Sequence, residues 1–313
     1  MLLLLAACLH TEPAAPPASP GASLGACPVF PPADPWNQRV DGLPADPTWT
    51  DRLQRLVGDA RLHPDFGNYV DPPIEERYGI PYNVVPADQP LVPVTYDAWP
   101  EESDAGPFPL PGPDAALIEG GTPRACDGDC HLLVVQEGAC RLFEGYACRY
   151  EGGWVCANGA AWDLRAPSPG QRPEGWTSAD AAGLPIFAGL ARYDEVAAGE
   201  VAHALRFTVH CTADAHVPPA THHAVPRACR PGEDAIAPPM GLRVRLRADV
   251  DLSGFSPDAR VLLTAMQRYG LILADNGSDL YVQSALDPRW GEAVDELKQV
   301  PASAFEVVAP GGP

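Results

Sequence analysis

The stretch Ala202-His203-Ala204-Leu205-Arg206-Phe207-Thr208-Val209 alternates between two kinds of side chain. Successive side chains of an extended chain point to opposite faces, so His203, Leu205, Phe207 and Val209 share one face. Arg206 and Thr208 lie on the other face. Residues 241–250 repeat the alternation, with arginine at positions 243, 245 and 247. Both segments therefore predict half-buried strands, and a sheet as the basis of the fold.

Further strand signals lie on both sides of a turn at Glu151-Gly152-Gly153, at residues 131–135, 141–150, 154–156 and 160–164. Proline occupies 38 of the 313 positions and is spread along the chain. Such a distribution argues against a helical bundle, because proline removes a helix hydrogen bond and clashes with the preceding turn. We therefore expect a mainly β fold, with a single-domain β-sandwich-like core over residues 27–313 and a few peripheral α-helices.

The clearest helix signal covers residues 257–269, with Ser256 as N-cap, proline at the first helical position and Gly270 after the end. A buried strand at 271–274, a turn at 275–278 and a returning strand at 280–284 are expected to follow. A shorter helix is predicted over residues 51–59. Thr50 is its expected cap, and Leu53, Leu56 and Val57 are expected on one face.

The first eight residues, Met1-Leu2-Leu3-Leu4-Leu5-Ala6-Ala7-Cys8, match the end of a bacterial lipoprotein signal. We expect residues 1–7 to be removed, Cys8 to be acylated, and residues 8–26, rich in Pro, Ala and Ser, to act as a tether. The run is short and has no basic residue before it, so a start further upstream and a buried apolar strand stay open as alternatives. The expected location is the cell envelope or surface, outside the cytoplasm, with the membrane as partner through the lipid.

Cysteine usage agrees with export, because eight cysteines remain once Cys8 is set aside. An even set in an oxidising compartment predicts up to four disulfides. Cys211 and Cys229 are expected to close one local loop, and the cluster from 126 to 156 to hold two more bridges. A zinc site at Cys126 and Cys130 is the alternative.

The formal net charge of −20 argues against nucleic acid as a partner, because such a chain repels polyanions at long range. It also makes an acidic polysaccharide a less natural substrate than a neutral one. No segment after the N-terminus approaches the roughly 18 apolar residues that a membrane-spanning helix needs.

Several motifs together resemble a family of secreted bacterial proteins of unknown function. They are Asp34-Pro35-Trp36-Asn37, Tyr78-Gly79-Ile80-Pro81-Tyr82, the run from Gly175 to Pro185, Arg192-Tyr193-Asp194-Glu195-Val196 with Gly199-Glu200, the run from Tyr269 to Ser278, and Asp287-Pro288-Arg289-Trp290. The resemblance covers most of residues 28–307. It implies export and a single domain, and it implies no activity.

Five of the eight histidines lie between residues 203 and 223, close in sequence to several arginines. This local reversal of charge is compatible with an anion-binding pocket, with acid/base side chains, or with a polar loop closed by Cys211 and Cys229. A metal site with His216, His222, His223 and Asp214 as ligands is a further alternative. Their spacing matches no metal motif, so we expect no metal and no cofactor.

The candidate catalytic residues are histidines and carboxylates, because acid/base chemistry on sugars needs such pairs. A polysaccharide lyase needs a base and a neutraliser for the substrate carboxylate, roles that suit histidine and Arg206. A glycoside hydrolase needs two carboxylates. We expect the principal residues to be Glu200, His203, His222, His131 and Asp163. The other candidate carboxylates are Glu144, Asp194, Glu195 and Asp275.

Other enzyme classes lack their motifs: the chain has no Gly-x-Ser-x-Gly, no glycine-rich phosphate loop before a helix and no His-Glu-x-x-His. Trp154, Trp162, Trp176 and Trp290 are candidates for stacking on sugars, but core packing is expected. The sequence thus favours an exported, lipid-anchored protein that acts on or binds extracellular carbohydrate, as a glycoside hydrolase or polysaccharide lyase if it is an enzyme. The alternative is a non-catalytic structural or adhesion lipoprotein of the envelope.

Overall fold

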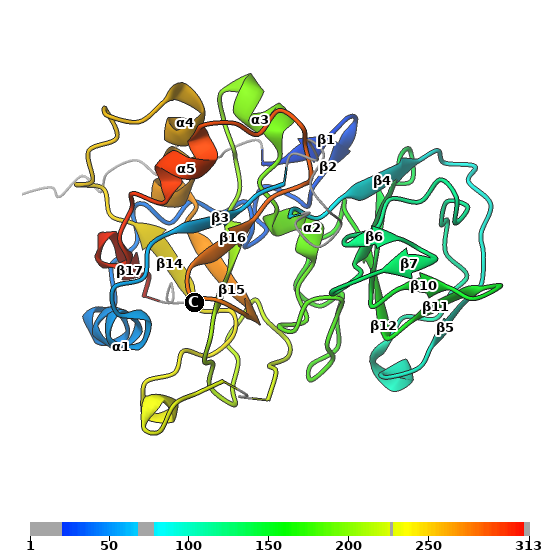
Figure 1. The fold of residues 1–313 in the computed structure, drawn as a ribbon, viewed down its shortest axis with the longest axis horizontal. Helices are drawn as coiled ribbons and strands as arrows, with labels where there is room; N and C mark the ends of the chain where they lie inside the picture. Colours follow the sequence, from blue (N-terminus) through cyan, green and yellow to red (C-terminus); the bar gives the residue numbers. More distant parts are fainter. Residues whose placement is uncertain (1–20, 68–77, 226–227, 310–313) are drawn as a thin grey trace, which may run out of the picture.

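The computed structural model describes residues 21–67, 78–225 and 228–309. The protein is mainly β, with few and short helices, which confirms the expected fold class. The largest sheet has six strands (Figure 1). Their order across the sheet is β17 (Phe305–Val307), β14 (Arg243–Leu246), β15 (Leu271–Asn276), β13 (Leu205–Val209), β16 (Tyr281–Gln283) and β3 (His63–Asp65).

A second region, which we call the crosslinked region, comprises residues 82–163 and holds two further sheets. The four-stranded sheet has the order β12 (Asn158–Asp163), β9 (Arg141–Tyr146), β8 (Leu132–Gln136) and β4 (Tyr82–Val85). The three-stranded sheet has the order β10 (Arg149–Tyr150), β11 (Trp154–Cys156) and β5 (Val94–Tyr96). Two small hairpins complete the strands: β1 (Ser23–Leu24) with β2 (Cys27–Pro28), and β6 (Gly121–Thr122) with β7 (Ala125–Cys126).

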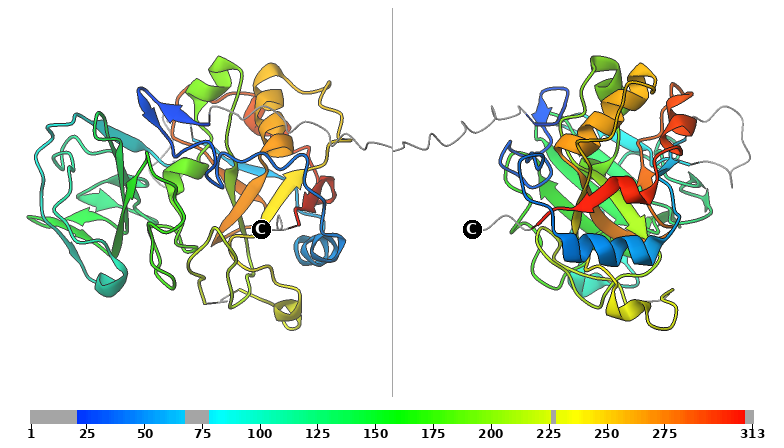
Figure 2. Two further views of the ribbon diagram at one scale, coloured as in Figure 1. Left: turned by 180° about the vertical axis from the view of Figure 1, so that it is seen from behind. Right: turned by 90° about the vertical axis from the view of Figure 1, so that its left-hand side faces the viewer.

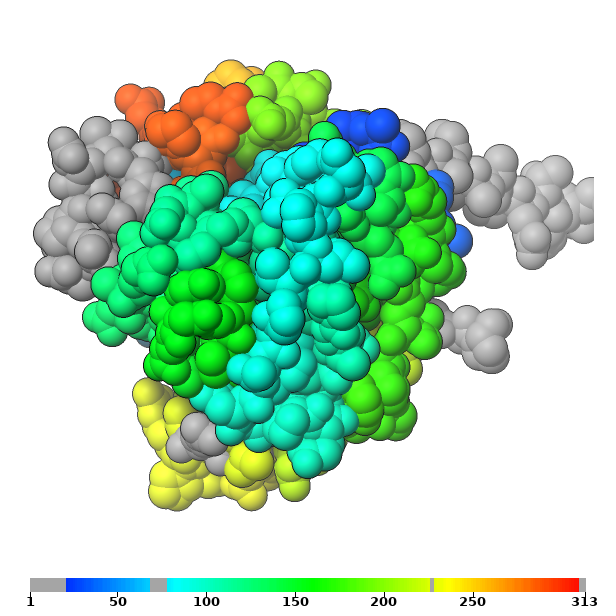
Figure 3. Space-filling model, turned by 90° about the vertical axis from the view of Figure 1, so that its right-hand side faces the viewer, coloured from blue at the N-terminus to red at the C-terminus, as the bar shows by residue number. Residues whose placement is uncertain are grey.

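The helices cover the edges and faces of the six-stranded sheet, and Figure 2 shows α1 below and α4 above its strands in the right-hand view. Figure 3 shows the opposite end of the molecule, where the crosslinked region forms the surface. The α-helices are α1 (Pro47–Val57), α2 (Ile186–Gly189), α3 (Tyr193–Ala198), α4 (Pro257–Arg268) and α5 (Ala293–Leu297). Short 3₁₀ helices lie at Pro100–Glu102 (η2), Glu233–Ala235 (η3) and Ala302–Ala304 (η4).

Two apolar cores hold these layers together. The larger core joins residues of the six-stranded sheet, such as Phe207 and Leu271, to residues of the four-stranded sheet, such as Leu133 and Trp162. The smaller core lies on the other side of the four-stranded sheet and includes Val134. The four-stranded sheet therefore buries both faces, which explains why residues 131–135 read as a continuous apolar run rather than an alternating one.

Helix α4 confirms its sequence signals, because the Ser256 hydroxyl accepts a hydrogen bond from the Ala259 amide and Pro257 is the first helical residue. The cap predicted for α1 is wrong. Asp46 is the N-cap, accepting from the amides of Thr48 and Trp49, and the helix begins at Pro47. The Thr50 hydroxyl instead donates to the Asp46 carbonyl inside the first turn. The buried face of Leu53, Leu56 and Val57 is as expected.

The expected hairpin between residues 271 and 284 is also wrong. Both strands form as β15 and β16, but β13 lies between them in the sheet. Strand β13 pairs parallel with β15 and antiparallel with β16. The turn expected at 275–278 begins later, because β15 continues through Asp275 and Asn276. A local turn is compatible with either arrangement, so only the insertion of a strand from far along the chain decides the pairing.

Four disulfides form from the eight cysteines. Cys211–Cys229 closes the expected local loop, and Cys126–Cys130 and Cys148–Cys156 are the two bridges expected within the cluster. Cys126 and Cys130 are therefore bonded to each other, which contradicts the zinc alternative. The fourth bridge, Cys27–Cys140, joins the N-terminal hairpin to the crosslinked region. Four disulfides are typical of proteins in oxidising, extracytoplasmic compartments.

Candidate functional site

A polar cavity of about 190 Å³ lies where the six-stranded sheet meets the crosslinked region. Both regions supply charged side chains to it, and a hollow with converging ionisable groups is the first place to look for function. The sheet contributes Asp65, Arg206 and Asp275, and the crosslinked region contributes Glu119, Asp129 and His131.

A β-bulge puts two of these residues on the same face. In β13 and β15, Phe207 pairs with Leu273 and Thr208 pairs with Asp275, so Ala274 is an extra residue in the ladder. Without the extra residue, the alternation would turn the side chain of Asp275 to the face opposite Arg206. With it, the Asp275 carboxylate lies 3.9 Å from the Arg206 guanidinium. Bulges commonly re-aim a side chain in this way beside functional sites.

Arg206 is the buried cation at the back of the cavity. Its guanidinium binds both oxygens of Asp180, at 2.9 and 3.2 Å, and donates to the Gln283 side chain at 2.8 Å. Asp180 is fully buried, and Arg206 is 3% exposed. Such a pair is held together because separating either member would leave an uncompensated charge in the protein interior.

His131 forms the opposite wall of the cavity. Its Nδ1 lies 2.5 Å from Glu119 Oε2, and its Nε2 lies 3.2 Å from the carbonyl of Ala179. A carboxylate and a carbonyl both accept hydrogen bonds, so this ring carries protons on both nitrogens and is positively charged. Burial opposes that charge, but the Glu119 carboxylate outweighs it and raises the pKa of His131 to about 9.

The disulfide Cys126–Cys130 positions this pair. This disulfide lies within the loop that connects Glu119 to His131. The same loop contains the β6–β7 hairpin. The Glu119 amide donates to the His131 carbonyl at 3.1 Å, which closes the loop at its base. The loop that contains the bridge thus brings together an acid and a histidine that are 12 positions apart in sequence.

Two carboxyl groups of the cavity have pKa values that are raised toward neutral pH. Burial, with the nearby Glu119, raises the pKa of Asp65 to about 6. Burial, with the nearby Asp180, raises the pKa of Asp275 to about 7, although 31% of the Asp275 side chain remains open to the cavity. One carboxyl group can therefore be protonated while the other is ionised near neutral pH, which is the condition for paired acid and base chemistry.

Of the five principal residues expected from the sequence, only His131 lines this cavity. Glu200 lies at the surface, 3.6 Å from Arg268, in a wider hollow of about 450 Å³ against α4. That hollow lacks the buried charged pairs of the cavity. Asp163 accepts from the Arg165 amide at 3.0 Å and caps a local turn. The structure therefore gives both residues a surface location away from His131.

The two other histidines have structural partners. His203 is fully buried, with its Nδ1 2.7 Å from the Ala204 carbonyl and its Nε2 3.1 Å from Glu195. His222 Nδ1 donates to the Ala181 carbonyl at 2.7 Å. Among the described residues, the lining of this cavity therefore includes none of Glu200, His203, His222 and Asp163.

Among the other candidate carboxylates, Asp275 is in the cavity and Glu144 is not. Glu144 accepts from the amides of Ile186 and Phe187, at 3.0 and 2.8 Å, at the start of α2. Burial raises its pKa to about 7. Trp154, Trp162 and Trp290 are buried in the cores, as expected. Sequence reasoning missed Asp65, Glu119 and Asp180 as site residues, because they lie far apart along the chain. Of the three, Asp180 lies within a run already noted, from Gly175 to Pro185, but no role was assigned to it.

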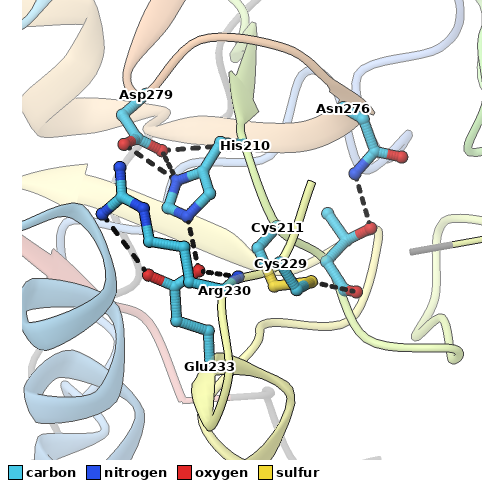
Figure 4. Close-up of a disulfide and its surroundings, with 8 residues drawn as sticks. His210, Cys211, Cys229, Arg230, Glu233, Asn276 and Asp279 are labelled. Atoms are coloured by element: carbon cyan, nitrogen blue, oxygen red, sulfur yellow. Dashed lines mark hydrogen bonds and ion pairs between the residues drawn. A yellow bond between two sulfur atoms is a disulfide. The ribbon is translucent and has the colours of Figure 1, made fainter. Parts of the chain in front are cut away.

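His210 is fixed at the edge of the disulfide loop, as Figure 4 shows. Its Nδ1 lies 2.8 Å from Asp279, and its Nε2 lies 2.9 Å from Glu233. Beside it, Cys211–Cys229 closes the loop, and Asn276 donates to the Thr212 hydroxyl at 2.7 Å. These contacts attach the histidine-rich segment to the end of β15 next to the cavity.

Comparison with known proteins returned no match to a family model, a curated protein or a solved structure. The resemblance noted from the sequence motifs therefore stays an expectation. Within the described ranges, none of the helices is long and apolar enough to cross a membrane. Cys8 and the signal lie outside those ranges.

Proposed function

We propose that this protein is an exported, lipid-anchored glycoside hydrolase that cleaves neutral carbohydrate, with Asp275 as the acid and Asp65 as the second carboxylate. The observation that carries the proposal is that both carboxyl groups line one cavity, with the buried Arg206 3.9 Å from Asp275. Glycoside hydrolysis uses two carboxyl groups in different protonation states on either side of the scissile bond.

The two roles follow from the environments of the two acids. Asp275, with its pKa raised to about 7, gives its proton to the glycosidic oxygen as the carbon–oxygen bond breaks. Water adds to the sugar carbon, and Asp65, with its pKa of about 6, is ionised and receives the proton that the water loses. Activity is expected to be highest between about pH 6 and pH 7, where Asp65 is ionised and Asp275 is still largely protonated.

The charges of the cavity favour a neutral sugar over an acidic one. A lyase acting on uronates needs a free cation to neutralise the substrate carboxylate. Here Arg206 is occupied by Asp180, and His131 is occupied by Glu119. The remaining ionisable groups of the lining are the carboxyl groups of Asp65, Asp129 and Asp275, and those that are ionised would repel an anionic substrate.

Location supports an extracellular substrate. The four disulfides fit an oxidising compartment. The pattern ending in Leu5-Ala6-Ala7-Cys8 supports export and a lipid anchor in the cell envelope. The tether then places the catalytic region outside the membrane, where carbohydrate is the expected partner.

The test is to incubate the purified full-length protein in detergent with a panel of neutral and acidic polysaccharides. New reducing ends and the absorbance of unsaturated products are followed together, because lysis produces both and hydrolysis only the first. Reducing ends from a neutral polymer without the absorbance are expected. Both signals would instead indicate a lyase, and silence across the panel would favour the non-catalytic envelope lipoprotein.

Variants separate the cavity from the residues first suggested by the sequence. Asp275→Asn and Asp65→Asn are each expected to lower kcat by roughly 100-fold or more, because each removes a proton-transfer group. Glu200→Gln is the matched control, since Glu200 lies at the surface outside the cavity. Loss of activity in the Glu200 variant with retention in the Asp275 variant would move the active site to the hollow at α4.

A further inference from the structure

Two histidines of the disulfide-closed loop face each other in an unusual way. His216 Nδ1 and His223 Nδ1 are 3.2 Å apart. On the far side of each ring, Nε2 meets a carboxylate: Glu174 at 2.6 Å for His216, and Asp214 at 2.9 Å for His223. Both rings are thus oriented by an acid on one nitrogen and directed at each other by the second nitrogen.

The hydrogen-bond chemistry of this arrangement needs a cation between the rings. An ionised carboxylate only accepts hydrogen bonds, so each Nε2 carries the proton. A neutral imidazole has one proton, which leaves a lone pair on each Nδ1. Two lone pairs facing each other at 3.2 Å repel, unless a proton or a metal ion lies between them.

We propose that His216 and His223 bind one divalent transition-metal ion through their Nδ1 atoms. Neutral imidazole nitrogens favour Zn²⁺, Cu²⁺ and Ni²⁺ over Mg²⁺ or Ca²⁺. Two nitrogens at about 2.0–2.1 Å from one ion, in neighbouring tetrahedral or octahedral positions, are about 2.8–3.4 Å apart. The separation of 3.2 Å falls within that span.

The carboxylates complete the pattern expected of metal-binding histidines. Such histidines donate their other ring N–H to an acid or carbonyl, which fixes the tautomer and raises the basicity of the ligating nitrogen. Glu174 and Asp214 occupy those positions for His216 and His223.

The protein supplies two ligands, and water fills the remaining positions. Within the described parts of the chain, no group of three or more His, Cys, Asp or Glu side chains converges to hold a metal. His216 and His223 are 18% and 31% exposed, so water reaches both rings. His222 stacks beside His223 at 5.7 Å, with its own Nδ1 occupied by the Ala181 carbonyl.

The loop holds the two rings before any ion arrives. Its ends are joined by Cys211–Cys229, and His216 forms a parallel bridge with Met240. The amides of Thr221 and His222 both donate to the Ala182 carbonyl, at 3.0 and 3.2 Å. These bonds attach the loop to the segment that carries Asp180, the partner of Arg206. The metal site itself does not depend on the proposed hydrolase activity.

The test measures binding of ZnCl₂ and NiCl₂ to untagged full-length protein by calorimetry and equilibrium dialysis at neutral pH. Cys8→Ala is present in every sample, so that no thiol left without its lipid can bind these ions. We expect one ion per chain and a rise in Tm with metal that EDTA reverses. His216→Gln and His223→Gln are each expected to abolish saturable binding.

Two further variants keep the result interpretable. His210→Gln is the matched control, because His210 lies on the same loop base but is enclosed by Asp279 and Glu233, and it should bind as the parent does. Asp214→Asn should weaken binding roughly 10- to 100-fold by releasing the His223 ring. Near-ultraviolet circular dichroism checks that each variant folds. The proposal would be overturned if the parent showed no saturable binding, or if the His216 and His223 variants bound metal as tightly as the parent does. A proton, rather than a metal ion, would then lie between the two Nδ1 atoms.

Discussion

The crosslinked region and the six-stranded sheet are stabilised by different means. The sheet belongs to the larger apolar core and is covered by α1 and α4. The crosslinked region surrounds the smaller core, and three of the four disulfides have at least one cysteine in it. A small core supplies little burial free energy, so covalent links that limit the unfolded chain are of most use there.

The cavity lies between the two regions, so the difference bears on function. Arg206 and Asp275 come from the sheet, whereas Glu119 and His131 come from a disulfide-closed loop of the crosslinked region. One wall of the cavity thus belongs to a loop closed by a disulfide, and the other wall belongs to the sheet in the larger apolar core. Variants in either wall show which wall contributes more to the free energy of unfolding and which contributes more to activity.

The largest effect is expected from removing the bridge between the N-terminal hairpin and the crosslinked region. Cys27→Ala with Cys140→Ala should lower the free energy of unfolding by about 5 kcal/mol, because the bridge closes a loop of about 110 residues. Cys126→Ala with Cys130→Ala should cost only about 2 kcal/mol, since that loop is very short. Urea unfolding of both variants measures the difference. Equal losses would show that loop length does not govern the stability of this region.

The next effect concerns the buried pair of the cavity. Asp180→Asn should lower the free energy of unfolding by about 3 kcal/mol, because it leaves the Arg206 guanidinium buried beside a neutral side chain. Asp163→Asn, at a partly exposed turn, is the control and should change it by less than about 0.5 kcal/mol. Chemical denaturation distinguishes them, and a stable Asp180 variant would mean that Asp275 takes over as the partner of Arg206.

A smaller effect is expected at a helix of the sheet region. Ser256→Ala should cost about 1 kcal/mol, because it removes the hydroxyl that accepts from the Ala259 amide at the start of α4. Thr50→Ala, at the position first expected to cap α1, should disturb its helix less through capping, since Asp46 is the cap there. Thermal unfolding of both variants checks the assignment, and a larger loss for Thr50 would point to its bond with the Val307 amide.

The smallest effect is a pH dependence at the edge of the disulfide loop. Burial lowers the pKa of His210, but hydrogen bonds to Glu233 and Asp279 outweigh it and raise the pKa above the usual 6.5. The charged form is therefore favoured in the folded state. The stabilisation is fully present below about pH 6.5 and is lost as pH rises through the higher folded pKa. Comparing Tm against pH for the parent and His210→Gln tests this: parallel curves would contradict it.

The sequence by itself determined the local features of this protein. The strand at residues 205–209, the cap of α4, the turn before β11 and the loop between Cys211 and Cys229 follow from neighbouring residues. The expected exposure of one face of that strand was wrong, because all five of its residues are buried. Side-chain period, capping chemistry and short-loop closure act over a few positions, so they are visible in the chain itself.

Only the tertiary structure decided what assembles at the cavity. Strand β13 enters between β15 and β16, and one extra residue in β15 turns Asp275 toward Arg206. Asp180 then pairs with an arginine 26 positions away, and Asp65 arrives on the edge strand β3. A local pattern cannot specify these contacts, because burial and strand pairing between distant segments choose the neighbours. The acidity of each group depends in turn on those neighbours.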